Sequence, residues 1–265
     1  MEFVSQIGGG VTDALTYVGS LASLGGRAAY DSFIGPFLGK PVRLQRAVSQ
    51  AMDVGVRALP ILSLITFFIG LILALQGAYE LRRFGAINYV AATVAISMTR
   101  ELGPLITAIV VIGRSGSSFA AEIGTMKVTE EIDALETMAI SPVDFLVAPK
   151  FVAMVVMVPC LTIWANAMGI LGGSLFGVWQ AGFTFVRYMQ VSVDALILRD
   201  ITTGLMKSVI FGATITAVGC LEGLSTGVGA EQVGRATTAA VVKSIFLVIL
   251  EDVVFTALFF FVGAP

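Results

Sequence analysis

The sequence predicts an all-α integral membrane protein with about five transmembrane helices, an N-terminal interfacial helix and a short cytoplasmic helix. Three observations lead to this fold class. Hydrophobic residues make up 57% of the 265 residues and charged residues only 13%, and the mean hydropathy is +0.93. Water-soluble chains carry about 25% charged residues, so lipid is the solvent that suits this composition. Apolar runs of about 20 residues, long enough to cross a hydrocarbon core of about 30 Å, recur along the chain.

The composition also excludes several function classes. Without any histidine, the chain cannot use His-based acid–base catalysis or the commonest zinc ligand sets. The net charge of −2 gives no reason to expect a nucleic-acid partner. The two cysteines, Cys160 and Cys220, lie in apolar runs and are predicted to be packing residues. We therefore predict no metal site and no catalytic residue, and we do not expect an enzyme.

The N-terminal region, residues 1–57, is predicted to lie at the membrane interface, ahead of a transmembrane domain at 58–265. Its two apolar segments, Val11–Leu24 and Ala28–Leu38, are rich in glycine and too short to cross a bilayer. Such segments are typical of interfacial or amphipathic helices. A basic cluster follows them, formed by Lys40, Arg43, Arg46 and Arg57.

The predicted transmembrane domain contains five apolar spans separated by polar or Gly-rich stretches. The third is long enough to span with a tilt or a bend. Polar stretches are expected at Gly113–Asp144 and 180–200, and a Gly-rich loop at Gly223–Gly234. The five spans are Ala58–Ala78, Tyr89–Ile112, Phe145–Trp179, Ile201–Leu221 and Ser244–Val262.

The basic residues predict the orientation of the chain. Five crossings place the termini on opposite sides, and positive residues favour the cytoplasmic side. With the N-terminus inside, ten of the 16 lysines and arginines fall on cytoplasmic segments, which leaves six outside. We therefore expect a cytoplasmic N-terminus and a periplasmic C-terminus, although Arg82 and Arg83 oppose this. The ten are Arg27, Lys40, Arg43, Arg46, Arg57, Arg114, Lys127, Lys150, Arg235 and Lys243.

The stretch after the second span predicts a short amphipathic helix at about 128–140. Thr129 is a suitable N-cap, and Ser141-Pro142 ends the helix. Ile132, Leu135 and Met138 recur on one face. Four acidic residues occupy the rest: Glu130, Glu131, Asp133 and Glu136.

The acidic residues of this helix favour a protein partner. Helices that lie on a membrane surface generally carry lysine and arginine, because the cytoplasmic leaflet is anionic. A helix on the membrane surface is the alternative interpretation.

Charged residues within the predicted spans are the candidate functional residues. Such residues are costly in lipid and usually face a protein interior or a wet cavity. For Arg100 and Glu101, the alternatives are contact with a lipid head group and a structural ion pair between helices. For Lys207 with Asp252 or Asp200, we expect a buried structural pair.

Several motifs together resemble the MlaE/YrbE permease family of MCE-associated ABC transporters, over roughly residues 40–262. They are Leu75-Gln-Gly77, Arg100-Glu-Leu-Gly-Pro104, Gly113-Arg-Ser-Gly116, Ala121-Glu-Ile-Gly-Thr-Met126, Thr129-Glu-Glu-Ile-Asp133, Ser141-Pro142, Gly172-Gly-Ser174, Lys207-Ser208 and Arg235-Ala-Thr-Thr238.

The resemblance implies a homodimer of permeases in the bacterial inner membrane that transports phospholipid and maintains lipid asymmetry. It implies a cytoplasmic ABC ATPase, coupled through the short helix at Glu130, Glu131, Ile132, Asp133, Leu135 and Glu136, and a periplasmic MCE-domain protein. It places head-group contacts at Arg100 and Glu101 and acyl-chain contacts at Leu73, Leu81 and Phe84. No G-x-x-x-x-G-K-[ST] loop occurs in the sequence, so ATP and Mg²⁺ would be bound by the partner ATPase.

Two other function classes remain open from the residues alone. A stand-alone transporter or channel driven by an ion gradient would use Arg100, Glu101, Lys207 and Asp252 as a relay. Inverted repeats are typical of such proteins, and no convincing repeat occurs in this sequence. An intramembrane enzyme would need a nucleophile and a base, and nothing beyond a serine assisted by Lys207 is available.

Overall fold

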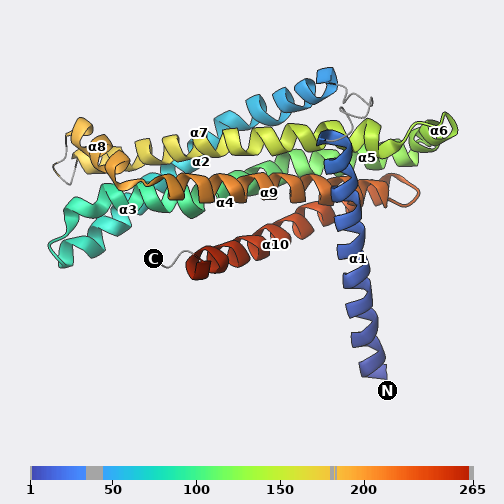
Figure 1. Ribbon diagram of the computed structural model, residues 1–265, viewed down its shortest axis with the longest axis horizontal. Helices are drawn as coiled ribbons and strands as arrows, with labels where there is room; N and C mark the ends of the chain where they lie inside the picture. The colour runs from blue at the N-terminus through green and yellow to red at the C-terminus, as the bar shows by residue number, and fades with distance from the viewer. Residues whose placement is uncertain (1, 34–43, 180–181, 183, 263–265) are drawn as a thin grey trace. The chain divides into compact units, whose positions relative to one another are not determined.

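The computed structural model describes the chain except residues 1, 34–43, 180–181, 183 and 263–265 (Figure 1). The described residues contain helices and no strand, so the predicted all-α fold class is confirmed. Lys40, Arg43 and the end of the predicted segment Ala28–Leu38 lie outside the described residues.

Five helical runs are long and apolar enough to cross a membrane, as predicted. Their lengths of 27–42 residues exceed the roughly 20 needed, so each continues beyond the hydrocarbon core. The first, fourth and fifth runs are α2 (Leu44–Arg83), α9 (Leu198–Leu224) and α10 (Ala230–Val262), and the third joins a π-helical turn, η5 (Val143–Val147), to α7 (Ala148–Trp179). The second combines η2 (Ile87–Tyr89), α3 (Val90–Ser97), η3 (Met98–Leu102), α4 (Gly103–Val111), η4 (Ile112–Gly116) and α5 (Ser117–Val128).

The helices extend into two stretches that were predicted to be polar or loop-like. The second run continues through Gly113 to Val128, and α9 and α10 leave only residues 225–229 between them. The loop predicted at Gly223–Gly234 is therefore shorter than expected and is confined to residues 225–229. Gly223 lies inside α9, where an added Cβ would come 2.8 Å from the Cβ of Ile123. Gly223 therefore allows close packing between two helices and does not form a turn.

The N-terminal region forms one helix, α1 (Glu2–Phe33), instead of the two short segments predicted. Leu24, Ala28 and Ser32 are buried at a spacing of four residues, whereas Arg27 between them is exposed. This spacing keeps one face turned inward, so α1 is amphipathic. The Ser32 hydroxyl donates to the carbonyl of Ala148 at 3.4 Å. The domain boundary expected after residue 57 falls inside α2.

The chain divides into two compact units, and α2, α7, α9 and α10 each contribute to both. The first unit comprises Met1–Gln50, Ser115–Ala153 and Ala213–Ser244. It includes α1, α5 and α6 (Glu131–Thr137). The second unit comprises Ala51–Arg114, Met154–Gly212 and Ile245–Pro265, and includes α3, α4 and α8 (Phe185–Ala195).

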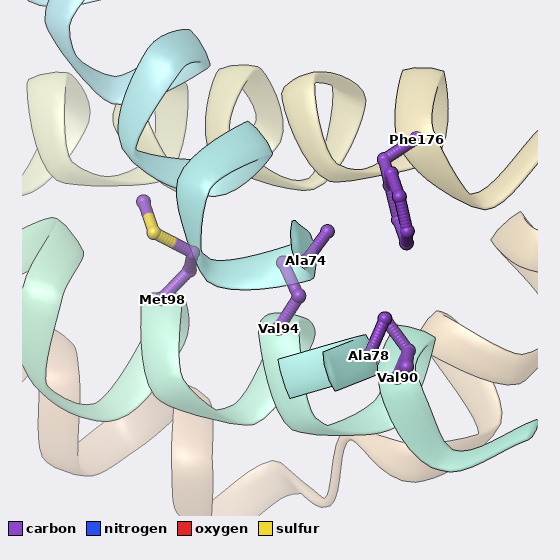
Figure 2. Close-up of a cluster of buried hydrophobic side chains, with 6 residues drawn as sticks. All are labelled: Ala74, Ala78, Val90, Val94, Met98 and Phe176. Atoms are coloured by element: carbon purple, nitrogen blue, oxygen red, sulfur yellow. The ribbon is translucent and has the colours of Figure 1, made fainter. Parts of the chain in front are cut away.

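The second unit has a core of small and medium apolar side chains (Figure 2). Phe176 of α7 points toward Ala78 and Val90, and Ala74 and Val94 continue the cluster. Alanine on α2 keeps the helices close, because in lipid the packing of small residues drives helix association. Gly172 of α7 has the same effect. A Cβ there would come 1.9 Å from the carbonyl oxygen of Phe67 on α2.

Candidate functional site

The candidate site in the second unit begins where α9 approaches the π-helical turn η3. Pro104 has no N–H to donate to the carbonyl of Arg100, so the helix lacks one regular hydrogen bond next to this wider turn. A Cβ on Gly204 of α9 would come 2.2 Å from the carbonyl oxygen of Thr99. This close backbone contact places Arg100 and Glu101 beside α9.

Arg100 forms an ion pair with Asp200 of α9 through its Nε–H. Asp200 is only 1% exposed and also accepts the backbone N–H of Ile197 at 3.2 Å. The Arg100 side chain, in contrast, is 47% exposed. The pair uses one of the five guanidinium N–H groups, so the others remain available for a ligand.

Lys207 is the centre of a second group of charges, which we call the Lys207 cluster: Glu101, Lys207, Asp252 and Thr256. The Lys207 ammonium lies 2.5 Å from Glu101 Oε2 and 2.9 Å from Asp252 Oδ1. It donates its third hydrogen bond to the Thr256 hydroxyl at 2.8 Å. A lysine has three N–H donors, and all three are used. Lys207 is 1% exposed, so the cluster satisfies it without water.

The Lys207 cluster joins η3, α9 and α10 by interhelical ion pairs. Both oxygens of Glu101 are occupied, because Thr256 lies 3.1 Å from the second one. Two carboxylates face one ammonium, so Glu101, Lys207 and Asp252 carry a net charge of −1 together. Arg100 and Glu101 are adjacent in sequence and have the same two alternative roles in the sequence analysis, but their surroundings in the structure differ. Glu101 is committed to the protein, whereas Arg100 keeps free donors.

The residues predicted to contact acyl chains differ in exposure. Leu73 and Leu81 are partly buried and pack against the core that contains Ala74 and Val94. Phe84 is 80% exposed at the end of α2. Among the three, Phe84 is therefore the side chain with the most surface to offer a lipid.

The predicted coupling helix is present in the first unit as α6, next to α5 (Figure 1). It spans Glu131–Thr137, which is shorter than the predicted 128–140. Thr129 is not its N-cap, because α5 continues to Val128 and Thr129 donates to the carbonyl of Thr125 at 3.0 Å. Glu130 takes the N-cap position in the left-handed conformation, with φ 60°. Ala139, with φ 58°, follows the C-cap Met138 ahead of Ser141-Pro142.

The two faces of α6 are distinct. Ile132 and Leu135 are 2% and 7% exposed, so they anchor the helix to its own chain and are not presented to a partner. Glu130, Glu131, Asp133 and Glu136 are exposed, as is Met138. Asp133 is paired with a cation, with Lys127 Nζ 2.9 Å from its Oδ1. The surface that α6 presents is therefore acidic, with one apolar residue at its end.

Sequence reasoning missed three groups of polar contacts. Thr256 completes the Lys207 cluster, and its position four residues after Asp252, on the same face of a helix, was the available signal. The other two groups are ion pairs in the first unit. Lys150 pairs with Glu122 at 2.6 Å, and Lys243 pairs with Glu222 at 2.7 Å. The count of basic residues places Lys150 on a cytoplasmic segment, although it lies inside the third apolar run.

Known proteins are similar to this chain over most of its length. The family model described as Permease MlaE matches residues 47–258. The intermembrane phospholipid transport system permease protein MlaE of Haemophilus influenzae is 37% identical over 99% of each chain. A probable ABC transporter permease protein of Rickettsia typhi is 40% identical over 83% of this chain and 85% of its own. The chloroplastic protein TRIGALACTOSYLDIACYLGLYCEROL 1 of Arabidopsis thaliana is 34% identical over 84% of this chain and 63% of its own. This chain belongs to the MlaE permease family.

Proposed function

We propose that this protein is the permease subunit of an ABC transporter that moves phospholipid between the inner membrane and a periplasmic MCE-domain protein. ATP hydrolysis in a separate subunit drives the movement. The observation that carries this proposal is the full-length similarity to the Haemophilus influenzae protein, whose name states phospholipid transport. The half-exposed Arg100 on a membrane-spanning helix gives the proposal a chemical basis.

In this proposal Arg100 binds the phosphate of the transported lipid. A guanidinium suits phosphate because its planar N–H groups match two phosphate oxygens at once. Asp200 holds the side chain from one edge and leaves the other edge for the ligand. Glu101, Lys207 and Asp252 hold the surrounding helices together, and Phe84 supplies apolar surface for an acyl chain.

The exposed acidic face of α6 is the proposed contact with the ATPase. Closure of two ATPase subunits around ATP and Mg²⁺ would move the α6 helices of two permease copies and change the lipid path between them. The permease itself hydrolyses nothing in this scheme and binds no nucleic acid. Its N-terminus lies in the cytoplasm and its C-terminus in the periplasm.

Affinity purification of the tagged chain from native membranes in a mild detergent tests the assembly. Mass spectrometry of the recovered proteins and lipids should identify an ABC ATPase, an MCE-domain protein and phospholipid. Co-purification of two differently tagged copies of the chain from the same cells tests for the homodimer. Recovery of the chain alone under several gentle conditions would contradict the proposal and favour the gradient-driven transporter.

A further inference from the structure

A polar pocket in the first unit belongs neither to the Lys207 cluster nor to the acidic face of α6. It is a cavity of about 240 Å³, below the roughly 300 Å³ at which pockets begin to hold whole small molecules. A pocket of this size suits a small polar group. Its lining comes from the start of α2, from α5 and from the junction of η5 with α7: Arg46, Ser49, Gln50, Glu122, Phe145, Leu146, Pro149 and Lys150.

The charges of this pocket favour one anion. Lys150 is 2% exposed and donates to Glu122 Oε2 at 2.6 Å, so these two charges cancel. Arg46 stacks on the Phe145 ring, 3.8 Å from its centroid, and has no carboxylate partner among the described residues. The net charge of the lining is therefore +1. Stacking holds the guanidinium by its face and leaves its edge, which carries all the N–H donors, open for an acceptor.

The position of the pocket along the membrane-spanning helices indicates where its ligand comes from. The first run begins at Gln45, the second ends at Val128, and the third begins at Val143. All three contribute to the lining within a few residues of these ends. These runs are longer than the hydrocarbon core, so the residues near their ends lie outside it, where lipid head groups can be reached. The phosphate of a lipid is an anion available at that level.

We propose that this pocket binds the phosphate of an anionic glycerophospholipid, such as phosphatidylglycerol. Arg46 contacts the phosphate oxygens, and Ser49 and Gln50 supply further hydrogen bonds. The single net positive charge matches one phosphodiester. Glu122 is neutralised by Lys150, so it offers little to the ammonium of a zwitterionic head group. The bound lipid is a fixed structural component beside α5 and is not transported. The inference therefore does not depend on the proposed transport function.

The test uses the purified full chain in phosphatidylcholine bilayers that contain a minor fraction of spin-labelled phosphatidylglycerol. Electron spin resonance measures the immobilised fraction of labelled lipid. Arg46→Gln should weaken the association about fivefold, the effect of one basic residue at an anionic membrane surface. Glu122→Gln should strengthen it by a similar factor, because it raises the charge of the pocket to +2. Arg57→Gln is the matched control, since Arg57 lies on the same helix, is 67% exposed and pairs with Asp53 outside the pocket.

Opposite changes in Arg46→Gln and Glu122→Gln, with no change in Arg57→Gln, establish the site. A purely structural role would not strengthen binding in any variant. An unchanged immobilised fraction in Arg46→Gln, or an equal loss in Arg57→Gln, would overturn the proposal. Equal immobilisation of labelled phosphatidylcholine would overturn the preference for an anionic lipid. Displacement of the label by inorganic phosphate would show a site for a soluble anion, and it would overturn the lipid assignment.

Discussion

The Lys207 cluster and α6 differ in whether their charged side chains are paired inside the protein or exposed. In the cluster, a buried ammonium donates to two carboxylates and a hydroxyl, and no donor is left over. On α6, the apolar side chains Ile132 and Leu135 are buried and the four acids are exposed. The charges of the Lys207 cluster are paired within the protein, whereas the acidic side chains of α6 are exposed and can contact a partner. Arg100 is intermediate, because it is paired on one edge and half exposed.

The largest effect is expected from Lys207→Met. The substitution leaves Glu101, which is 38% exposed, and Asp252, which is 15% exposed, facing each other without a cation. Removing one partner of a buried pair costs about 3–5 kcal/mol, and solvent around Glu101 places the expected loss at the lower end of this range. Unfolding of the purified protein in detergent, followed by circular dichroism, measures the loss. The triple variant Lys207→Met, Glu101→Gln, Asp252→Asn should recover most of it. If Lys207→Met is as stable as the control Lys127→Met, which removes a lysine that is 36% exposed, the cluster is not structural.

Charge reversal on α6 should act on assembly and leave stability nearly unchanged. Exposed substitutions change the free energy of unfolding by about 0.5 kcal/mol or less. Like charges at an interface cost several kcal/mol, so Glu131→Lys with Glu136→Lys should weaken ATPase binding by about a hundredfold. Titration of the purified permease with the ATPase found by affinity purification measures this. The control is Glu80→Lys, a charge reversal at the end of α2. Normal ATPase binding by the α6 variant would show that α6 is not part of the interface.

Gly204→Ala tests the backbone contact that places Arg100 and Glu101. A methyl group there meets the Thr99 carbonyl at 2.2 Å, and such overpacking costs about 1–3 kcal/mol. Gly77→Ala is the matched control on α2, where an added Cβ has nothing within 4 Å. The same unfolding measurement should show a loss for Gly204→Ala and none for Gly77→Ala. Equal behaviour of the two variants would mean that α9 does not depend on this contact.

The smallest effect is expected from Arg100→Lys. Lysine keeps a charge that can reach Asp200, so the unfolding free energy should change little. It loses the planar edge that binds two phosphate oxygens, so lipid transfer should fall about tenfold, the value of one charge-assisted hydrogen bond. Asp200→Asn, which weakens the pair but keeps the guanidinium, is the companion variant. Unchanged lipid transfer by Arg100→Lys would exclude phosphate recognition by this side chain.

The fold could be predicted from sequence because its main signals are local. Apolar runs of about 20 residues identify the five spans, but they do not show where the helices end. Gly113 and Gly223 look like loop residues, yet both lie inside helices. Gly223 packs there against Ile123 of another helix. Such packing depends on a partner surface that a single segment does not encode.

The site could be predicted only as a set of residues. Charges in apolar runs mark Arg100, Glu101 and Lys207, but their pairing depends on the register between helices. Lys207 reaches Glu101 because Gly204, three residues earlier, fixes that register against Thr99. The same register brings Arg100 into contact with Asp200, with which it forms an ion pair. The sequence alone could not decide which of the two neighbours would keep free donors.

The most direct test of the account is phospholipid transfer in proteoliposomes that contain the permease with or without its ATPase. The transfer of a fluorescent phospholipid to an acceptor protein is followed with ATP, without ATP, and with a proton gradient in place of ATP. We expect ATP-dependent transfer only when the ATPase is present, and we expect charge reversal on α6 to abolish that transfer. Gradient-driven transfer by the permease alone would contradict it and would make the Lys207 cluster part of an ion relay.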